Sequence, residues 1–490
     1  MTPVVNRVLL TAVFLLPPGA LQQAGPNPPP LTLFFEAASP DAKVSERALD
    51  ALAAVWKDSY TALLVDVARF LPRSAPGPGV DVLSLDPDTG GSFGTGDGRA
   101  VRSTPAARTR ARIVRFLERQ TKQRFGDDLG QWREWMWRLP DDPHPDAAAF
   151  KAELYGRIDP RMRLFFPTGA AASIRLDEID WGGVPVNGIP PLDHPRVIAA
   201  ADASYLKDSH IVFGVAINGE ARAYPRRVLA WHEMAHDRLG GLEITVVYCT
   251  LCGTVIPYES VVGGRRFTFG TSGLLYRSNK LMFDQETASL WSMLDGSPAV
   301  GPLVGSGLRL KARPVVTTTW GEWRAQHPGT TVLSIETGHA RDYSEGAAYR
   351  DYFATDRLMF RVPKRDSRLK NKDEVLGILV PAPGGGRQAA AYDVRLLAKR
   401  RVFETAVEGR RLVIVTSANG ANRVYDAGDI RFSPKPSADG TITDLDGGRW
   451  TVAEESLVLR GANRQLARVP AWRAFWFGWY AQFPETLLFK

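Results

Sequence analysis

The sequence predicts an α+β protein in which a small all-α domain precedes a β-rich domain with a few helices. Apolar residues recur at helical spacing over residues 44–71 and again over about 109–139. After about residue 165 the chain changes to short β-rich runs that are separated by Gly and Pro. With 490 residues, 44% of them hydrophobic, the chain can form two or three domains with large cores.

The first 24 residues predict a signal peptide or an N-terminal anchor. Arg7 precedes an apolar run over residues 8–16, which is too short to cross a bilayer as a helix. No clean cleavage site follows this run, so an uncleaved anchor is an alternative. Residues 25–42 are interpreted as a Pro-rich linker. We therefore expect an exported protein, periplasmic or extracellular, with no transmembrane domain beyond such an anchor.

A helical domain is predicted over residues 43–150, with a Gly-rich loop over residues 73–106. The aromatic and leucine positions between Leu117 and Trp135 resemble the pattern that closes HEAT-like repeats, in which paired helices stack to share one core. A domain of this kind would offer a surface to a protein partner. The sequence does not identify that partner.

The charge distribution argues against a nucleic-acid partner. Lys and Arg total 61 against 53 Asp and Glu, which gives a net charge of +8. The basic residues are scattered and form no run that could line a groove. We therefore expect a solvated surface.

The β-rich domain is predicted over residues 165–490. Residues 210–225 are typical of a hairpin, because two alternating runs flank Asn218-Gly219. At the other end of the domain, the aromatic residues between Trp472 and Phe483 are expected to lie along one helix docked on the core.

Residues 232–236 match His-Glu-x-x-His, the zinc signature of many metallopeptidases. A helix is predicted over 226–239, between a Pro that can start it and a Gly pair that can stop it. Both histidines could then share a zinc ion, with Glu233 as general base in a zinc-dependent hydrolase. The extended peptidase motif would supply a third His, but Leu242 stands at that position.

The two cysteines, Cys249 and Cys252, form a Cys-x-x-Cys-Gly turn that follows a strand, the shape of half a zinc knuckle. His232 precedes this strand by one tight turn and completes a candidate ligand set for zinc or copper. His339 is a candidate fourth ligand, and His236 is an alternative one. The cysteines could instead form a structural disulfide or a redox-active pair.

From about residue 177 onward, the chain resembles an uncharacterised prokaryotic family, the domain of unknown function 3179 family. The resemblance is carried by "DEIDWGGVPVNGIPPLDHP", "ARAYPRRVLAWHE", "VVYCTLCGT", "GTSGLLYRSNKLMFDQETASLW", "TGHARDY" and "AFWFGWYAQFPET". The family pattern includes His232, Glu233, Asp237, Cys249, Cys252 and His339. It has Asn where this chain has His236, which favours His232 as the functional histidine. The resemblance implies export but no particular activity.

A polar set also matches the family pattern. It is interpreted either as a turn network that braces hairpins or as a ligand pocket beside the cysteines. Its members are Ser272, Ser278, Asn279, Asp284, Thr287 and Trp291.

Three function classes follow from these patterns. The leading prediction is an exported protein with a metal or redox site built on Cys249, Cys252 and His232. The second is a zinc-dependent hydrolase that uses His232, Glu233 and His236. The third is a binding or scaffold domain without catalysis, in which the cysteines form a disulfide. The sequence predicts no substrate.

Overall fold

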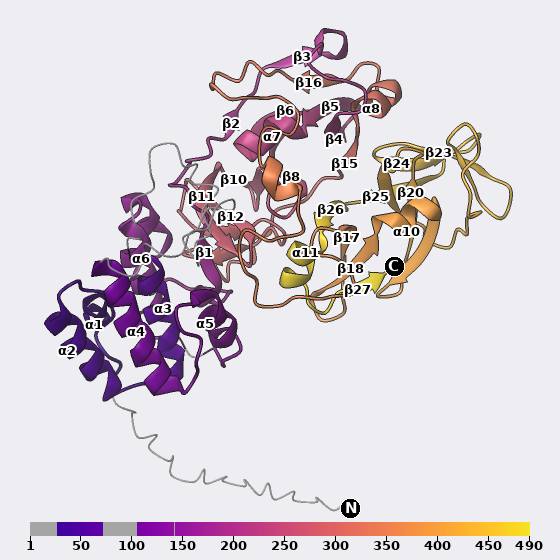
Figure 1. The fold of residues 1–490 in the computed structure, drawn as a ribbon. Coiled ribbons are helices and arrows are strands. Elements are labelled where there is room, and N and C mark those ends of the chain that lie inside the picture. Colours follow the sequence, from indigo (N-terminus) through magenta and orange to yellow (C-terminus); the bar gives the residue numbers. More distant parts are fainter. Residues whose placement is uncertain (1–26, 72–104, 142) are drawn as a thin grey trace, which may run out of the picture.

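The computed structural model describes residues 27–71, 105–141 and 143–490 (Figure 1). The predicted signal peptide or anchor and nearly all of the Gly-rich loop lie outside the described residues. The α+β fold class is confirmed: helices form the N-terminal part, and strands dominate the rest. Over these described ranges, no helix is both long and apolar enough to cross a membrane.

The N-terminal region is a group of short helices at one end of the molecule (Figure 1). Its α-helices are α1 Leu31–Ala37, α2 Ala42–Ala53, α3 Thr61–Arg69, α4 Pro105–Thr121, α5 Leu129–Met136 and α6 Ala147–Gly156. Short 3-10 helices lie at Asp58–Tyr60, Pro160–Phe165, Leu176–Glu178 and, further on, Ala200–Asp202. This arrangement does not confirm the HEAT-like repeats.

The predicted Pro-rich linker differs from the structure, because most of its second half is helical. Pro30 is the N-cap of α1, a position that needs no backbone N–H, and the helix buries Phe34 completely. Asp41 then caps α2 by accepting hydrogen bonds from the backbone of the first turn. The apolar sequence "LTLFFEA" therefore overrides the proline content of the residues before it.

The helices share a core with the first sheet of the β-rich region. That sheet has the order β1-β11-β12-β13-β14, with bounds Ile179–Trp181, Phe269–Tyr276, Asn279–Asp284, Leu290–Ser292 and Pro298–Val300. Leu274 and Leu281 of this sheet belong to the same buried cluster as Phe34 and Trp132. Buried ion pairs also join Asp180 to Arg69 and Arg133 at 2.9 and 2.8 Å. One core therefore crosses the predicted boundary between the two domains.

The remaining β-rich region contains the same set of elements twice. The first unit, residues 211–333, contains β4 Ile211–Ile217, β5 Glu220–Pro225, α7 Arg226–His232, β6 Met234–Leu239, β7 Leu242–Cys249, β8 Thr254–Glu259, β15 Val316–Thr319, α8 Trp320–Gln326 and β16 Thr331–Leu333. The second unit, residues 374–489, contains β17 Glu374–Pro381, β18 Arg387–Asp393, α10 Val394–Lys399, β19 Val402–Val407, β20 Arg410–Thr416, β21 Asn422–Asp426, β26 Trp472–Phe475, α11 Trp476–Gln482 and β27 Leu487–Phe489.

The two units also share their strand pairing. The orders β15-β4-β5-β16 and β26-β17-β18-β27 are both built from two antiparallel pairs followed by one parallel pair. Their sequences agree at matching places: "AYPRRVLA" at 223–230 corresponds to "AYDVRLLA" at 391–398, and "WGEWRAQHPGT" at 320–330 corresponds to "WFGWYAQFPET" at 476–486. The β-rich domain is therefore an internal duplication, which we did not predict from the sequence.

A glycine beneath a tryptophan fixes the helix of each unit on its sheet. A Cβ atom added to Gly214 would lie 2.3 Å from the Trp323 ring, and one added to Gly377 would lie 2.1 Å from the Trp479 ring. Each indole N–H then donates to the threonine that directly precedes the next strand, at 2.9 Å in both units. The same close approach therefore holds both helices.

Each unit extends a hairpin onto the other. In the first unit, β7 and β8 meet at a turn whose Cys252 carbonyl accepts a 2.8 Å hydrogen bond from the backbone of Phe475 in β26. In the second unit, Ala421 packs with Trp320 and Trp323 of the first. The units are therefore interlocked, and the first turn is buried against the second unit.

The other strands belong to connections and insertions. They are β2 Leu192–Asp193, β3 Val197–Ala199, β9 Val261–Val262, β10 Arg265–Arg266, β22 Ile442–Thr443, β23 Arg449–Val452, β24 Ser456–Leu459 and β25 Gln465–Val469, with the short helix α9 Arg350–Phe353. The first unit carries β9 to β14 between β8 and β15, whereas the second carries β22 to β25 between β21 and β26. The hairpin predicted at Asn218-Gly219 is confirmed as the β4–β5 turn.

The helix predicted over 226–239 was wrong in its second half. Helix α7 ends at His232, Glu233 adopts a left-handed conformation with φ of 56°, and β6 begins at Met234. Gly240 and Gly241, with φ of 54° and 80°, form the two-residue turn that pairs β6 with β7. The predicted aromatic helix near the C-terminus also begins later than expected, because residues 472–475 pair with β17 as a strand.

Candidate functional site

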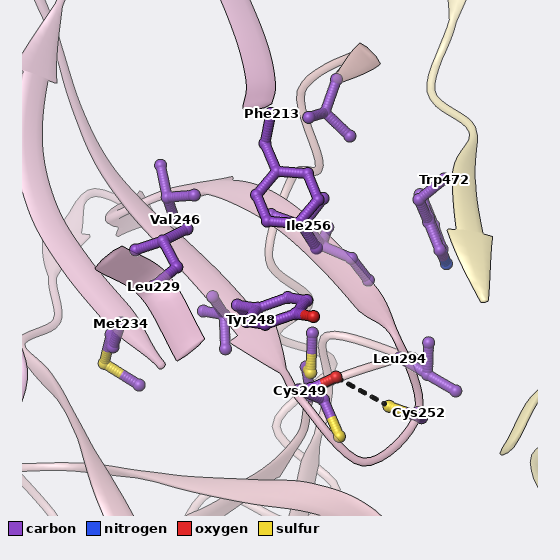
Figure 2. Packing of buried hydrophobic residues seen from close by; sticks show 14 of the residues in the cluster. Phe213, Leu229, Met234, Val246, Tyr248, Cys249, Cys252, Ile256, Leu294 and Trp472 are labelled. Carbon is purple, nitrogen blue, oxygen red and sulfur yellow. Dashed lines mark hydrogen bonds between the residues drawn. The ribbon is translucent and has the colours of Figure 1, made fainter. Parts of the chain in front are cut away.

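Cys249 and Cys252 lie at the closed end of the β7–β8 hairpin, where Figure 2 shows them below Tyr248. Both are free thiols and both are buried, with 2% and 0% of their surface exposed. The Cys252 sulfur lies 3.7 Å from the Cys249 carbonyl oxygen. Gly253 follows with φ of 63°, which lets the chain turn into β8.

The two thiols have opposite tendencies to ionise. Burial raises the pKa of Cys252 well above its usual value, and its hydrogen bond with Cys249 raises it further. Burial opposes ionisation of Cys249 as well, but hydrogen bonds from the Cys252 thiol and from the backbone of Cys252 and Lys280 lower the pKa of Cys249 overall. Cys249 is therefore the thiol that becomes a thiolate first.

Three elements cover the cysteine turn. The Tyr352 hydroxyl of α9 donates to the Leu251 carbonyl at 2.7 Å. The ring of Phe475 lies over Gly253, at 3.0 Å from the position that a Cβ atom there would take. Gly478 of α11 lies against Cys252, because a Cβ atom at 478 would be 2.7 Å from the Cys252 Cβ. These contacts close the turn that carries the two buried thiols.

A buried ion pair lies beside the thiols. Glu233 and Lys280 form a salt bridge, and each has less than a tenth of its side chain exposed. The Glu233 carbonyl accepts a 2.8 Å hydrogen bond from the backbone of Tyr248, the residue before Cys249. The sequence patterns pointed to Glu233 as a hydrolase base but did not point to Lys280.

His232 belongs to a different cluster from the cysteines. Its Nδ1 donates to the Pro190 carbonyl at 2.9 Å, so its Nε2 accepts from the Tyr343 hydroxyl at 2.5 Å. Tyr343 in turn is hydrogen-bonded to Thr337 at 2.6 Å. The His339 ring lies near that of His232, with centroids 5.0 Å apart.

Burial lowers the pKa of His232 to about 4, and the neighbouring His339 and Arg341 lower it further, although the hydrogen bond to Pro190 acts in the opposite direction.

The structure brings the predicted His232 and His339 together but does not group them with the cysteines. Among the residues that the structure describes, no three His, Cys, Asp or Glu side chains are placed to hold a metal ion. The predicted three-ligand set is not assembled.

His236 lies on β6 rather than on the helix of His232. Its Nδ1 is 2.5 Å from the Asp193 carboxylate of the neighbouring strand β2. The left-handed turn at Glu233 separates the helix of the first histidine from the strand of the second. The prediction that one helix presents both histidines to a zinc ion was therefore wrong.

The predicted polar set lies mostly within its own hairpins. The Asp284 carboxylate accepts hydrogen bonds from Thr287 and from the Trp291 indole, Ser272 donates to the Leu281 carbonyl, and Ser278 lies in the two-residue turn between β11 and β12. Asn279 differs, because its amide donates to the Gly478 carbonyl at 3.0 Å, on the helix that covers Cys252. This residue therefore links the β11–β12 hairpin to the cysteine site.

Sequence reasoning missed two participants that the structure brings into view. Lys280 gave no signal, since a lysine in a strand is ordinarily exposed. Tyr343 stands in "TGHARDY", the stretch that also carries His339, and this shared stretch could have suggested it as a partner for His232.

A family model described as "Protein of unknown function (DUF3179)" matches residues 186–486. This range includes both units of the duplication and both clusters described above. No curated protein and no solved structure matches the chain.

Proposed function

The chain belongs to this family of proteins of unknown function, and we propose that its β-rich domain carries a thiol redox centre at Cys249 and Cys252. The observation that carries the proposal is a pair of free thiols in one hairpin turn, one with a lowered pKa and the other with a raised pKa. This asymmetry gives one nucleophilic thiolate and one protonated partner that resolves the intermediate.

The reaction is thiol–disulfide exchange with an external disulfide as oxidant. The Cys249 thiolate attacks one sulfur of that disulfide, and the other sulfur leaves as a thiolate. Cys252 then loses its proton and its sulfur attacks the Cys249 sulfur, which releases the second thiol. Counted from the dithiol form, in which Cys249 first loses its proton to solvent, the protein gives up two electrons and two protons, and the two released thiolates take up two protons to become thiols.

The duplication supports a functional rather than a structural role for the cysteines. In the second unit, Ser417 follows β20 where Cys249 ends β7, and Gly420 takes the place of Cys252. That hairpin forms with the same strand pairing without a cysteine. A disulfide is therefore not required to build this turn.

Export is part of the proposal, since an oxidising compartment would supply the oxidant. The Arg7-led apolar run at the start of the chain supports it. The cover over the thiols would then limit the oxidant to small disulfides, or to a partner protein that displaces the cover.

The test is a redox titration of the purified full chain. The protein is equilibrated in glutathione buffers of increasing oxidation, trapped with an alkylating agent and weighed by mass spectrometry. We expect two alkylated thiols in reducing buffer, none in oxidising buffer, and a reversible two-electron transition between them. Cys249→Ser and Cys252→Ser should each remove that transition. Two thiols that stay reduced in every buffer would overturn the proposal.

Binding of zinc or copper by these thiols is the alternative to a redox role. The same purified protein can be used to test it. Two thiolates satisfy the soft-ligand preference of copper(I), whereas zinc needs at least three protein ligands. Metal analysis of the reduced protein decides between the two: a stoichiometric metal that Cys249→Ser abolishes would replace the redox assignment.

A further inference from the structure

The segment that connects the two units is strongly basic. Residues 357–372 contain seven Lys or Arg residues and one acidic residue, Asp366, whereas the whole chain has 61 basic and 53 acidic residues. We expected the basic residues to be scattered over the surface, and this segment is an exception. It lies between β16 and β17, outside both copies of the repeated topology, so the duplication does not account for its charge.

The basic segment lines a hollow in the protein surface. The hollow has a volume of about 450 Å³, and its lining combines residues 365–371 with Asp356, Asp373 and Arg395. Sites for small molecules have volumes of about 300–1,000 Å³, whereas a nucleic acid needs a basic face that extends over many residues. The shape of this surface therefore fits a small ligand.

The acidic side chains of the lining are held by donors of their own loop. The Asp356 carboxylate accepts three hydrogen bonds from residues 371 and 372. Asp366 accepts from the backbone and from Nε of Arg368, both at 2.8 Å, and Asp373 accepts from a backbone amide of the loop at 3.0 Å. The side chains of Asp366 and Asp373 are only 14% and 19% exposed. These carboxylates therefore shape the loop and add little negative charge to the hollow.

The basic side chains of the lining are more exposed than the acidic ones. Arg365, Arg368 and Arg395 have 51%, 42% and 59% of their side chains exposed. Arg365 lies 3.7 Å from Glu134 of α5, beyond hydrogen-bonding distance, and Lys370 forms no ion pair with any residue that the structure describes. Guanidinium and ammonium groups are the donors that bind carboxylate and phosphate groups in proteins. The hollow therefore presents positive charge to a ligand.

Arg368 is already fixed in the geometry that an anion would meet. Its guanidinium carbon lies 5.5 Å from the centre of the Trp476 ring and 5.8 Å from that of Tyr480. The Trp476 indole donates to the Asp366 carbonyl at 3.1 Å, which holds the loop against α11. Because the contact with Asp366 uses Nε, the two terminal nitrogens of Arg368 are left for an acidic group, and little side-chain entropy is lost on binding.

The loop that lines the hollow also supports the elements that cover the cysteine turn. Backbone carbonyls of residues 371 and 373 accept hydrogen bonds of 3.0 and 2.9 Å from the first turn of α11, the helix that packs on Cys252. Lys372 donates to the Tyr352 carbonyl in α9, and the hydroxyl of the same tyrosine holds Leu251. The hollow is therefore joined by direct contacts to the neighbourhood of the thiols.

We propose that this hollow binds a small ligand that carries two or more phosphate or carboxylate groups. Arg365, Arg368 and Lys370 supply the charges that bind these groups. Several cations around one hollow favour a multivalent anion over a singly charged one, because each additional charge-assisted hydrogen bond adds to the affinity. The inference goes beyond the redox function and holds whether or not the thiols form a disulfide.

The experiment is a calorimetric titration of the reduced full chain in a buffer without phosphate, with pyrophosphate and with citrate as probes. We expect at least one probe to bind with one-to-one stoichiometry and a Kd below about 1 mM. Arg365→Gln/Lys370→Gln should weaken binding at least about tenfold, since it removes two charged donors. Both side chains are exposed, so the unfolding midpoint of this variant should stay that of wild type.

The matched control is Arg266→Gln/Lys311→Gln, which removes two positive charges from side chains that are 60% and 66% exposed and lie outside the hollow. This variant should bind the probe as wild type does. Equal weakening in both double variants would mean that the net charge of the chain attracts anions without a site, and the proposal would fail.

A second result would also overturn the proposal. If neither pyrophosphate nor citrate binds, the hollow is no small-ligand site. Vesicles that contain an anionic lipid then serve as the next probe: binding that is lost in Arg365→Gln/Lys370→Gln would reassign this surface to a membrane contact. Binding of pyrophosphate alone would identify phosphate as the recognised group, and binding of citrate alone would identify carboxylate.

Discussion

The two units of the β-rich domain have the same topology, but only the first has cysteines. Each unit closes its sheet with a Gly–Trp contact and extends a hairpin onto the other. Their difference lies in the turn of that hairpin and in the residues around it. The comparison teaches that the candidate site is an addition to the fold, because the fold forms once with Cys249 and Cys252 and once without them.

The two turns differ in how closely a helix packs on them. Where the first hairpin has Cys252, the facing helix α11 has Gly478 with no side chain to obstruct it. Where the second hairpin has Gly420, the matching position of α8 is Glu322. A Cβ atom added to Gly420 would have only Arg473 within 4 Å, at 3.8 Å, so the close approach of helix and hairpin seen at Gly478 and Cys252 belongs to the first unit.

The largest effect is expected from the contact that both units share. Trp323→Ala and Trp479→Ala should each destabilise the protein by about 3–5 kcal/mol, because each removes a fully buried indole and leaves a cavity over a glycine. Denaturant unfolding would measure both. A cost in one unit several times that in the other would contradict the view that the two helices are held in the same way.

The next largest effect is a pH dependence of the unfolding free energy that comes from His232, in the first unit. The pKa of His232 is lowered to about 4 by burial, whereas the second unit has the exposed Arg400 at the matching position. Above about pH 6.5 this histidine is neutral in both the folded and the unfolded chain, and its contribution to stability is complete. As pH falls from 6.5 to 4, only the unfolded chain takes up the proton, so stability decreases, by about 2–3 kcal/mol.

Unfolding measured between pH 4 and pH 8 tests this slope. His232→Gln should flatten it over that window, while His236→Gln, on the neighbouring strand, should leave it in place. A wild-type curve without the slope would mean that His232 is protonated in the folded protein as well.

A smaller effect is expected at Gly478, where α11 lies against Cys252. Gly478→Ala should cost about 1–3 kcal/mol, because the new methyl group would lie 2.7 Å from the Cys252 Cβ. Glu322→Ala, at the matching place in α8, should cost less than about 1 kcal/mol, since no atom of Glu322 lies within 4 Å of a Cβ atom added to Gly420. Equal costs would show that the close approach of Gly478 to Cys252 has no energetic meaning.

The smallest effect on stability is expected for Cys249→Ser under reducing conditions. This variant copies Ser417 of the second unit, so the hairpin should form and the unfolding free energy should change by about 1 kcal/mol. Circular dichroism and denaturant unfolding would check this. Loss of the folded state would instead assign the cysteine a structural role.

The sequence predicted the class of the fold and several of its local elements for clear physical reasons. Asn218-Gly219 favours a two-residue turn whatever surrounds it, because both residues tolerate positive φ. The change from helical spacing to short β runs placed the helices and strands in the right parts of the chain. Local patterns also identified the Cys-x-x-Cys turn.

The sequence pattern failed after His232. Trp231, Ala235 and Leu239 have helical spacing, but β6 buries Ala235, Asp237 and Leu239 in alternation and ends at a glycine pair, and the buried Asp237 hides this period from the sequence. Pairing with β7, which is decided between segments, selects the strand. The separation of His232 from the cysteines follows from that choice.

By itself, the sequence determined which residues could do chemistry: two cysteines with the spacing of a turn, and histidines with a family pattern. Only the tertiary structure decided which of them meet. It placed His232 with Tyr343 and His339, brought Lys280 from an insertion to Glu233, and laid the second unit over the thiols. The reason is that these contacts join residues far apart in the chain, and short-range periodicity carries no information about such pairs.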